Sequence, residues 1–170
     1  YLKNLNIMQL GNIFAIAKSF KTDNESTVTL ENCVSRQWHY YAGSGIVAGY
    51  KEANLINCNF DIYEHSDTSS APFGSTKTVN IKDTHISYQV GGGRNGMSLF
   101  NGVTAMNITG TSAIDIKDIY TKDTLIRNVT DDTGCTVTLK DEASITADRR
   151  LRLRKLIMEG SSRFTVIGTS

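Results

Sequence analysis

The sequence is poor in proline, cysteine and aromatic residues, and it holds no long apolar run. Its 170 residues include 1 Pro and 3 Cys, and aromatic residues make up 8%. No stretch approaches the roughly 18 consecutive apolar residues of a membrane-spanning helix, so we expect no membrane insertion. Neither sign of charge predominates, since 18 Lys and Arg face 17 Asp and Glu. This balance argues against nucleic acid as a partner.

The cysteines are few, odd in number and far apart. Cys33, Cys58 and Cys135 form no C-x-x-C pair, and no His follows them at zinc-finger spacing. We therefore expect no metal site and no cofactor. Cys33 and Cys58 occupy equivalent sequence contexts, which favours small buried side chains over a disulfide or a nucleophile.

The length and the residue types suit one β domain. A chain of 170 residues can bury a sizeable core, and no linker-like stretch divides it, so we expect a single domain over residues 1–170. The chain begins at Tyr1 without an initiator Met and has no secretory apolar segment, which predicts a piece of something longer. Frequent Thr, Ser, Asn and Gly with short β-branched runs predict an all-β class.

One short phrase recurs along the chain. Residues 28–33 read V-T-L-E-N-C and residues 53–58 read A-N-L-I-N-C. Alternating apolar residues predict a strand with one buried side, and a final Asn, Asp or Gly tolerates the left-handed conformation of a sharp corner. The instances are Val28/Leu30/Asn32, Ala53/Leu55/Asn57, Val79/Ile81/Asp83, Met106/Ile108/Gly110, Ile114/Ile116/Asp118, Val137/Leu139/Asp141 and Leu156/Met158/Gly160, with a partial instance at Thr124/Ile126/Asn128.

The first corners are evenly spaced. They fall at residues 32, 57, 83 and 110, a period in the twenties that is typical of a solenoid. The L-x-x-L-x-L framework of leucine-rich repeats and any sustained helical periodicity are missing. The pattern therefore predicts a parallel β-helix whose coils stack about 4.8 Å apart. Asn32 would then lie under Asn57, with their side chains hydrogen-bonded, and Cys33 under Cys58.

The corners crowd together after residue 118. Two interpretations fit this crowding: either the coils shorten, or the later instances belong to different sheets of one coil. A change of coil geometry after about residue 120 is the matching expectation for the domain.

The phrase φ-x-φ-x-N-C-x-φ resembles the coils of right-handed parallel β-helices in the pectate-lyase-like superfamily. The resemblance covers most of residues 5–167 and carries no catalytic signature. With the Asn, Thr and Gly content, the chain looks most like the shaft or receptor-binding part of a bacteriophage tailspike or neck appendage. The resemblance implies a homotrimer that contacts other virion tail proteins and binds host surface polysaccharide, with a virion or extracellular location.

Three polar excursions follow the best-defined corners, at residues 35–50, 61–77 and 88–103. Because each follows the same strand of its coil, we expect all three on one side, where they could wall a groove. Aromatic faces beside hydrogen-bonding groups suit a carbohydrate. The predicted glycan-binding residues are Trp38, His39, Tyr40, Tyr41, Tyr63 and Arg94. The alternative is that the aromatic side chains pack under their own loops or fill a subunit interface.

The same excursions carry the candidate catalytic residues. Glycoside hydrolysis needs two carboxylates, for which Asp61, Glu64 and Asp67 are candidates. A lyase needs a base and a charge neutraliser, roles that suit His39, His65, Tyr63 and Arg94. Neither set has a diagnostic spacing.

Three functions stay open at this point. The first is a tailspike-type segment that binds, and could depolymerise, host polysaccharide. The second is a pectate-lyase-like polysaccharide lyase or glycoside hydrolase, with a complete site in one chain. The third is a non-catalytic adhesin or spacer. A trimer in solution favours the first, a monomer that cuts glycan the second, and a monomer without cleavage the third.

Overall fold

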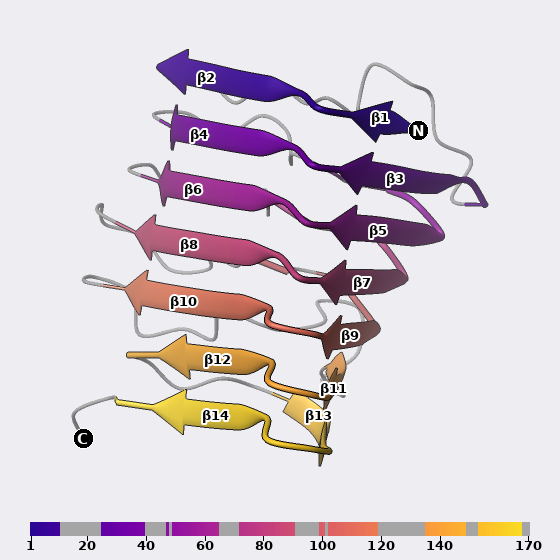
Figure 1. Cartoon of the computed structure of the whole chain (residues 1–170), viewed down its shortest axis with the longest axis vertical. Helices are drawn as coiled ribbons and strands as arrows, with labels where there is room; N and C mark the ends of the chain where they lie inside the picture. Colours follow the sequence, from indigo (N-terminus) through magenta and orange to yellow (C-terminus); the bar gives the residue numbers. More distant parts are fainter. Residues whose placement is uncertain are drawn as a thin grey trace.

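The computed structural model describes residues 1–10, 25–39, 47, 49–64, 72–90, 99–100, 102–118, 135–148 and 153–167. All regular secondary structure in these ranges is β-strand, arranged as stacked layers of two strands each (Figure 1). No helix in this part of the chain has the length and apolarity needed to cross a bilayer.

The strands form two seven-stranded sheets in which every described pairing is parallel. The first sheet holds β1 (Leu2–Lys3), β3 (Thr27–Glu31), β5 (Glu52–Ile56), β7 (Thr78–Lys82), β9 (Ala105–Thr109), β11 (Cys135–Leu139) and β13 (Leu153–Met158). The second sheet holds β2 (Asn6–Leu10), β4 (Val34–His39), β6 (Asn59–Glu64), β8 (His85–Val90), β10 (Ala113–Asp118), β12 (Ser144–Ala147) and β14 (Arg163–Val166). Each repeat thus gives one strand to each sheet, an arrangement compatible with a β-helix or solenoid-like fold.

The core follows from in-register stacking of the alternating apolar residues. Leu30, Leu55, Ile81 and Ile108 pair in register along the first sheet and are at most 1% exposed. Burying each such side chain contributes about 2 kcal/mol. In the core, the ring of Phe73, from the segment between β6 and β7, lies 5.4 Å from the ring of Phe60 on β6 in an edge-on contact.

The segments that return from the second sheet to the first also pair between repeats. The Val47 amide donates to the Pro72 carbonyl at 3.0 Å, and the Phe73 amide donates to the Leu99 carbonyl at 3.0 Å. Hydrogen bonds between successive repeats therefore extend beyond the two sheets and pair backbone groups of the return segments.

The corner between the two strands of each repeat has the predicted left-handed conformation. The corner residues with positive φ are Asn4, Asn32, Asn57, Asp83, Gly110, Asp141 and Gly160. A Cβ atom at Gly110 would collide with the carboxylate of Asp83, so a larger residue there would require the Asp83 side chain to shift.

The predicted stacking of Asn and Cys is confirmed. The Asn57 side chain donates to Asn32 Oδ1 at 2.7 Å, and Asn32 in turn donates to Asn4 Oδ1 at 3.3 Å. Directly inside this corner, the amide of Cys33 donates to Cys58 Sγ at 3.5 Å. The same inner position is filled by Thr84 one repeat later, where its hydroxyl accepts from the Cys58 amide at 3.0 Å.

Cys33 and Cys58 are small buried side chains, as the sequence predicted, and Cys135 is buried as well. All three are free and buried, and burial raises the pKa of Cys135 to about 12. The pKa of Cys58 is also raised, chiefly by burial. Because the thiolate is the nucleophile, a raised pKa suits a structural role.

The corner predicted at Asp118 is wrong. Asp118 is the last residue of β10, which belongs to the second sheet and follows β9 within one repeat. Counting a strand of the second sheet explains the extra corner at residue 118, because both sheets show the same period-two pattern. The next corner is Asp141, 31 residues after Gly110. The amide of Gly110 donates a hydrogen bond to the Asp141 carboxylate. The corners at Asp141 and Gly160 are both present and lie only 19 residues apart, so this coil is also shorter than the earlier ones. The partial instance at residues 124–128 lies outside the described residues.

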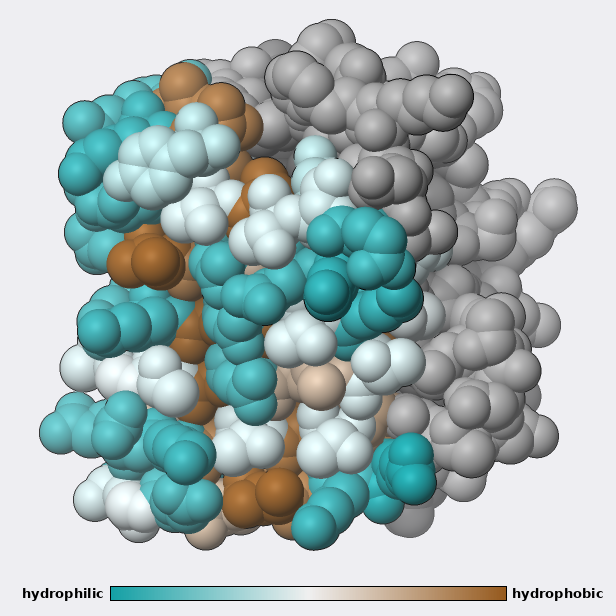
Figure 2. All heavy atoms as spheres, turned by 90° about the vertical axis from the view of Figure 1, so that its right-hand side faces the viewer, coloured by the Kyte–Doolittle hydropathy of each residue, from teal (hydrophilic) through white to brown (hydrophobic). Residues whose placement is uncertain are grey.

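The outer face of the first sheet carries a second row of stacked amides. Asn80 donates to Asn54 at 2.8 Å, and Asn107 donates to Asn80 at 2.8 Å. Figure 2 looks onto the side of the molecule where this sheet lies, and hydrophilic side chains cover much of its described part. These amides satisfy one another along the stack and hold the strands in register.

Candidate functional site

The three predicted excursions leave from neighbouring strands but begin later than expected. Residues 35–39, 61–64 and 88–90 belong to β4, β6 and β8, which lie side by side in the second sheet. The alternation that buries Phe60 and Ile62 explains why the strand continues past the corner. The loop tips at residues 40–46, 65–71 and 91–98 lie outside the described residues.

The same alternation turns a set of polar residues outward. On β6, Asn59 and Asp61 point away from the core because Phe60 between them is buried. Parallel register then aligns Arg36 of β4 with Asp61, and Asp61 with Ser87 of β8. Side chains that are distant in the sequence thus meet as one row across three strands.

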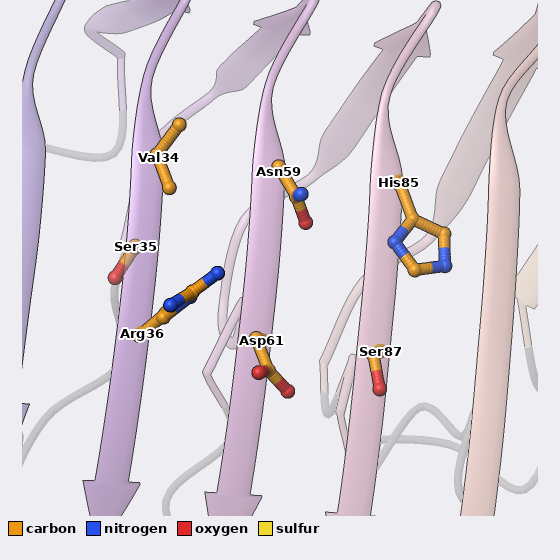
Figure 3. Close-up of a pocket in the computed structure, with 7 residues that line it drawn as sticks. All are labelled: Val34, Ser35, Arg36, Asn59, Asp61, His85 and Ser87. Carbon is orange, nitrogen blue, oxygen red and sulfur yellow. The ribbon is translucent and has the colours of Figure 1, made fainter.

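These outward residues line a shallow pocket of about 230 Å³, here called the β4–β8 pocket (Figure 3). Its lining residues are Val34, Ser35, Arg36, Asn59, Asp61, His85 and Ser87. The pocket lies on the sheet itself, so its lining is held by the parallel hydrogen bonds that join β4, β6 and β8.

Of the described charged and titratable side chains that line the β4–β8 pocket, His85 has an acidic partner on a neighbouring strand, while Arg36 and Asp61 form no ion pair with each other. Figure 3 shows the Arg36 side chain reaching from β4 towards β6, where its guanidinium lies near Asn59 and Asp61. No ion pair between Arg36 and Asp61 is present among the contacts of the described residues. His85 Nε2 lies 3.1 Å from Asp115 Oδ2 on β10, with the two side chains 47% and 45% exposed. Such half-exposed pairs contribute at most about 1 kcal/mol to stability.

The structure describes the positions of some of the site residues predicted from the sequence, whose predicted roles stay predictions. Asp61 lines the β4–β8 pocket. Tyr63 is half-buried on the same outward side of β6, and Trp38 is its register partner on β4. His39 and Glu64 are likewise register partners. The remaining predicted residues, Tyr40, Tyr41, His65, Asp67 and Arg94, lie outside the described residues.

Several pocket residues were not among the sequence-based candidates. Arg36, Asn59, His85 and Ser87 line the pocket, and Asp115 extends it through His85. A signal was present, because each lies two residues from another outward position on a strand with alternating burial. The sequence alone did not show which residues of neighbouring strands pair in register, so these side chains could not be grouped into one site.

Within the described ranges, no group of three or more His, Cys, Asp or Glu side chains could hold a metal ion. Comparison with protein-family models, with curated proteins and with solved structures finds no match. The functional assignment therefore depends on the geometry of the outer face of the second sheet.

Proposed function

We propose that this chain is a segment of a tailspike-type protein that binds polysaccharide of a host cell surface through the outer face of β4, β6 and β8. The observation that carries the proposal is the β4–β8 pocket, in which a guanidinium, a carboxylate, an amide, an imidazole and a hydroxyl converge from three strands. Sugar hydroxyls both donate and accept hydrogen bonds, so a mixed set of this kind suits them.

An aromatic position next to the pocket supports a carbohydrate ligand. Tyr63 lies two residues beyond Asp61 on the outward side of β6, and Trp38 is paired with it in register. Aromatic rings pack against the C–H faces of sugars while polar neighbours bind the hydroxyls. The polar row and Tyr63 would therefore contact adjacent parts of one extended ligand.

The scaffold supports binding because it is rigid. The pocket residues stand on strands whose backbones are hydrogen-bonded on both sides, as β6 is by β4 and β8. The backbone of such strands needs no further ordering when a ligand binds, which lowers the entropic cost of association.

The proposed fold is a right-handed parallel β-helix of the pectate-lyase-like kind. The repeated corners and the hydrogen-bonded return segments support this assignment, and parallel crossover connections are almost always right-handed. On the same analogy, the protein would be a homotrimer on the virion, attached to other tail proteins.

Binding to a panel of purified bacterial surface polysaccharides tests the proposal. We expect at least one polysaccharide to bind to the wild type. Asp61→Ala and Arg36→Ala should each raise its dissociation constant about tenfold or more. Glu142→Ala is the matched control, because Glu142 is exposed at a corner away from the pocket. Unchanged binding by Asp61→Ala and Arg36→Ala, or an equal loss in Glu142→Ala, would refute the β4–β8 pocket as the site. Binding to none of the panel by the wild type would refute polysaccharide binding and favour a spacer. Release of reducing ends by the wild type would add catalysis to the function.

A further inference from the structure

The described charges around the β4–β8 pocket include no excess of cations. The pocket holds one permanent cation, Arg36, and one carboxylate, Asp61. A second carboxylate, Asp115, contacts His85 at 3.1 Å from the neighbouring strand. With His85 neutral these groups sum to a single negative charge, and with His85 protonated they sum to zero.

We propose that the β4–β8 pocket selects a neutral glycan with neighbouring hydroxyl groups over one that carries carboxylates. This inference rests on the proposed function and narrows its ligand class. Two hydroxyls on adjacent sugar carbons can donate to the two oxygens of Asp61, while the Arg36 guanidinium donates to a third sugar oxygen. A sugar carboxylate in the same place would meet Asp61 and Asp115 as like charges.

Among the described residues, the wider surface of the sheet adds no cation beside the pocket. Lys117 is the next cation outward on β10, but it pairs in register with Gln89, beyond the row that contains Ser87 and Asp115. Arg163 starts β14, which β12 separates from β10. The whole chain has a formal net charge of only +1, so its long-range field would not concentrate acidic glycans.

The uncharged lining residues are consistent with the same ligand. Asn59 offers both an amide donor and a carbonyl acceptor, and Ser87 offers a hydroxyl. Val34, which is 37% exposed, gives the pocket an apolar edge against which C–H groups of a sugar can pack. None of these groups requires a charge on the ligand.

A matched pair of ligands tests the inference. Uronate-containing capsular polysaccharides are measured in native form and after carboxyl reduction, which replaces each carboxylate by a hydroxymethyl group and leaves the linkages unchanged. We expect the reduced form to bind about tenfold more tightly, with an affinity that changes little with added salt. Asp61→Asn should narrow this preference, while the control Glu142→Gln should leave it unchanged.

The outcomes separate the two proposals. Tighter binding of the native acidic form, weakened by salt, would overturn the neutral-glycan inference and leave polysaccharide binding standing. Binding of neither form, nor of neutral polysaccharides, would overturn both. Unchanged far-ultraviolet circular dichroism and melting temperature of the Asp61→Asn protein would ensure that a changed preference reflects the pocket rather than unfolding.

Discussion

The Nδ2 atom of Asn57 donates a hydrogen bond of 2.7 Å to Oδ1 of Asn32, 25 residues earlier in the chain and one repeat away. Both residues have positive φ, so each adopts the left-handed backbone that its own corner needs. The side chain of each also provides a hydrogen-bond partner for the side chain of the other. The same register that aligns these amides aligns Arg36, Asp61 and Ser87 on the outer face of the second sheet. Corner chemistry thereby determines which polar side chains meet in the pocket.

Replacing Asn57 by Leu should lower the free energy of unfolding by about 2 kcal/mol. The change removes the hydrogen bond to Asn32, worth about 1 kcal/mol, and places a γ-branched side chain at φ 50°, which costs about 1 kcal/mol more. Urea denaturation measures the difference. Asn57→Gly separates the two causes, because glycine tolerates the conformation and loses only the side-chain bond. Equal stability of the Leu variant and the wild type would contradict the stacked amide row.

The inner corner position should tolerate Ser but not Val at residue 58. Cys58 Sγ accepts from the Cys33 amide and lies 3.2 Å from the Ile56 carbonyl, contacts that the Thr84 hydroxyl reproduces one repeat later. Cys58→Val leaves the Cys33 amide buried without an acceptor, which costs about 1–3 kcal/mol. Thermal unfolding of the Ser and Val variants compares the two effects. If Val stabilised the protein relative to Ser, hydrogen bonding at this position would be unimportant.

Gly110 and Asp83 should behave as a coupled pair. Gly110→Ala forces a side chain into the Asp83 carboxylate at φ +65°, and we expect a loss of about 2–3 kcal/mol in unfolding free energy. Asp83→Gly keeps its own corner conformation and removes the obstructing carboxylate. The double variant should therefore lose less stability than the two single losses combined. Strict additivity in chemical denaturation would show that the collision is relieved elsewhere.

Stability should fall in alkaline solution, in part because of Cys135. Burial raises the pKa of this thiol from 9.0 to about 12. The unfolded thiol ionises first, so the stability linked to Cys135 is complete below pH 9 and is lost as the pH rises towards 12. The free energy of unfolding should drop between pH 8 and pH 10.5 more steeply in the wild type than in Cys135→Ala. Parallel pH profiles would indicate that the thiol is not desolvated in the folded protein.

The corners were predictable from the sequence because few residue types accept a left-handed backbone, so Asn32, Asn57 and Asp83 mark them clearly. The assignment of Asp118 failed because strands of both sheets share one alternation, and only the pairing partner distinguishes them. Asp61 was recognised as a polar residue after a corner, but for the wrong reason, since it lies on a strand and not in a loop. Sequence alone does not specify which outward residues of successive repeats become neighbours.

His85 offers the clearest separation of binding from folding. Its imidazole contacts Asp115, but both side chains are about half exposed, so His85→Ala should change the free energy of unfolding by less than about 1 kcal/mol. The same change removes a hydrogen-bonding group from the β4–β8 pocket and should weaken glycan binding severalfold. Thr146→Ala is the control, because Thr146 pairs in register with Asp115 but does not line the pocket.

Titration calorimetry of both variants with one bound polysaccharide decides the role of His85. Weakened binding by His85→Ala at unchanged stability, with Thr146→Ala like the wild type, places the imidazole in the ligand contact. If binding and stability instead fall together in His85→Ala, the imidazole acts through the strand packing between β8 and β10. In that case the ligand would lie towards β4 and β6, where Arg36 and Asp61 remain the groups to contact it.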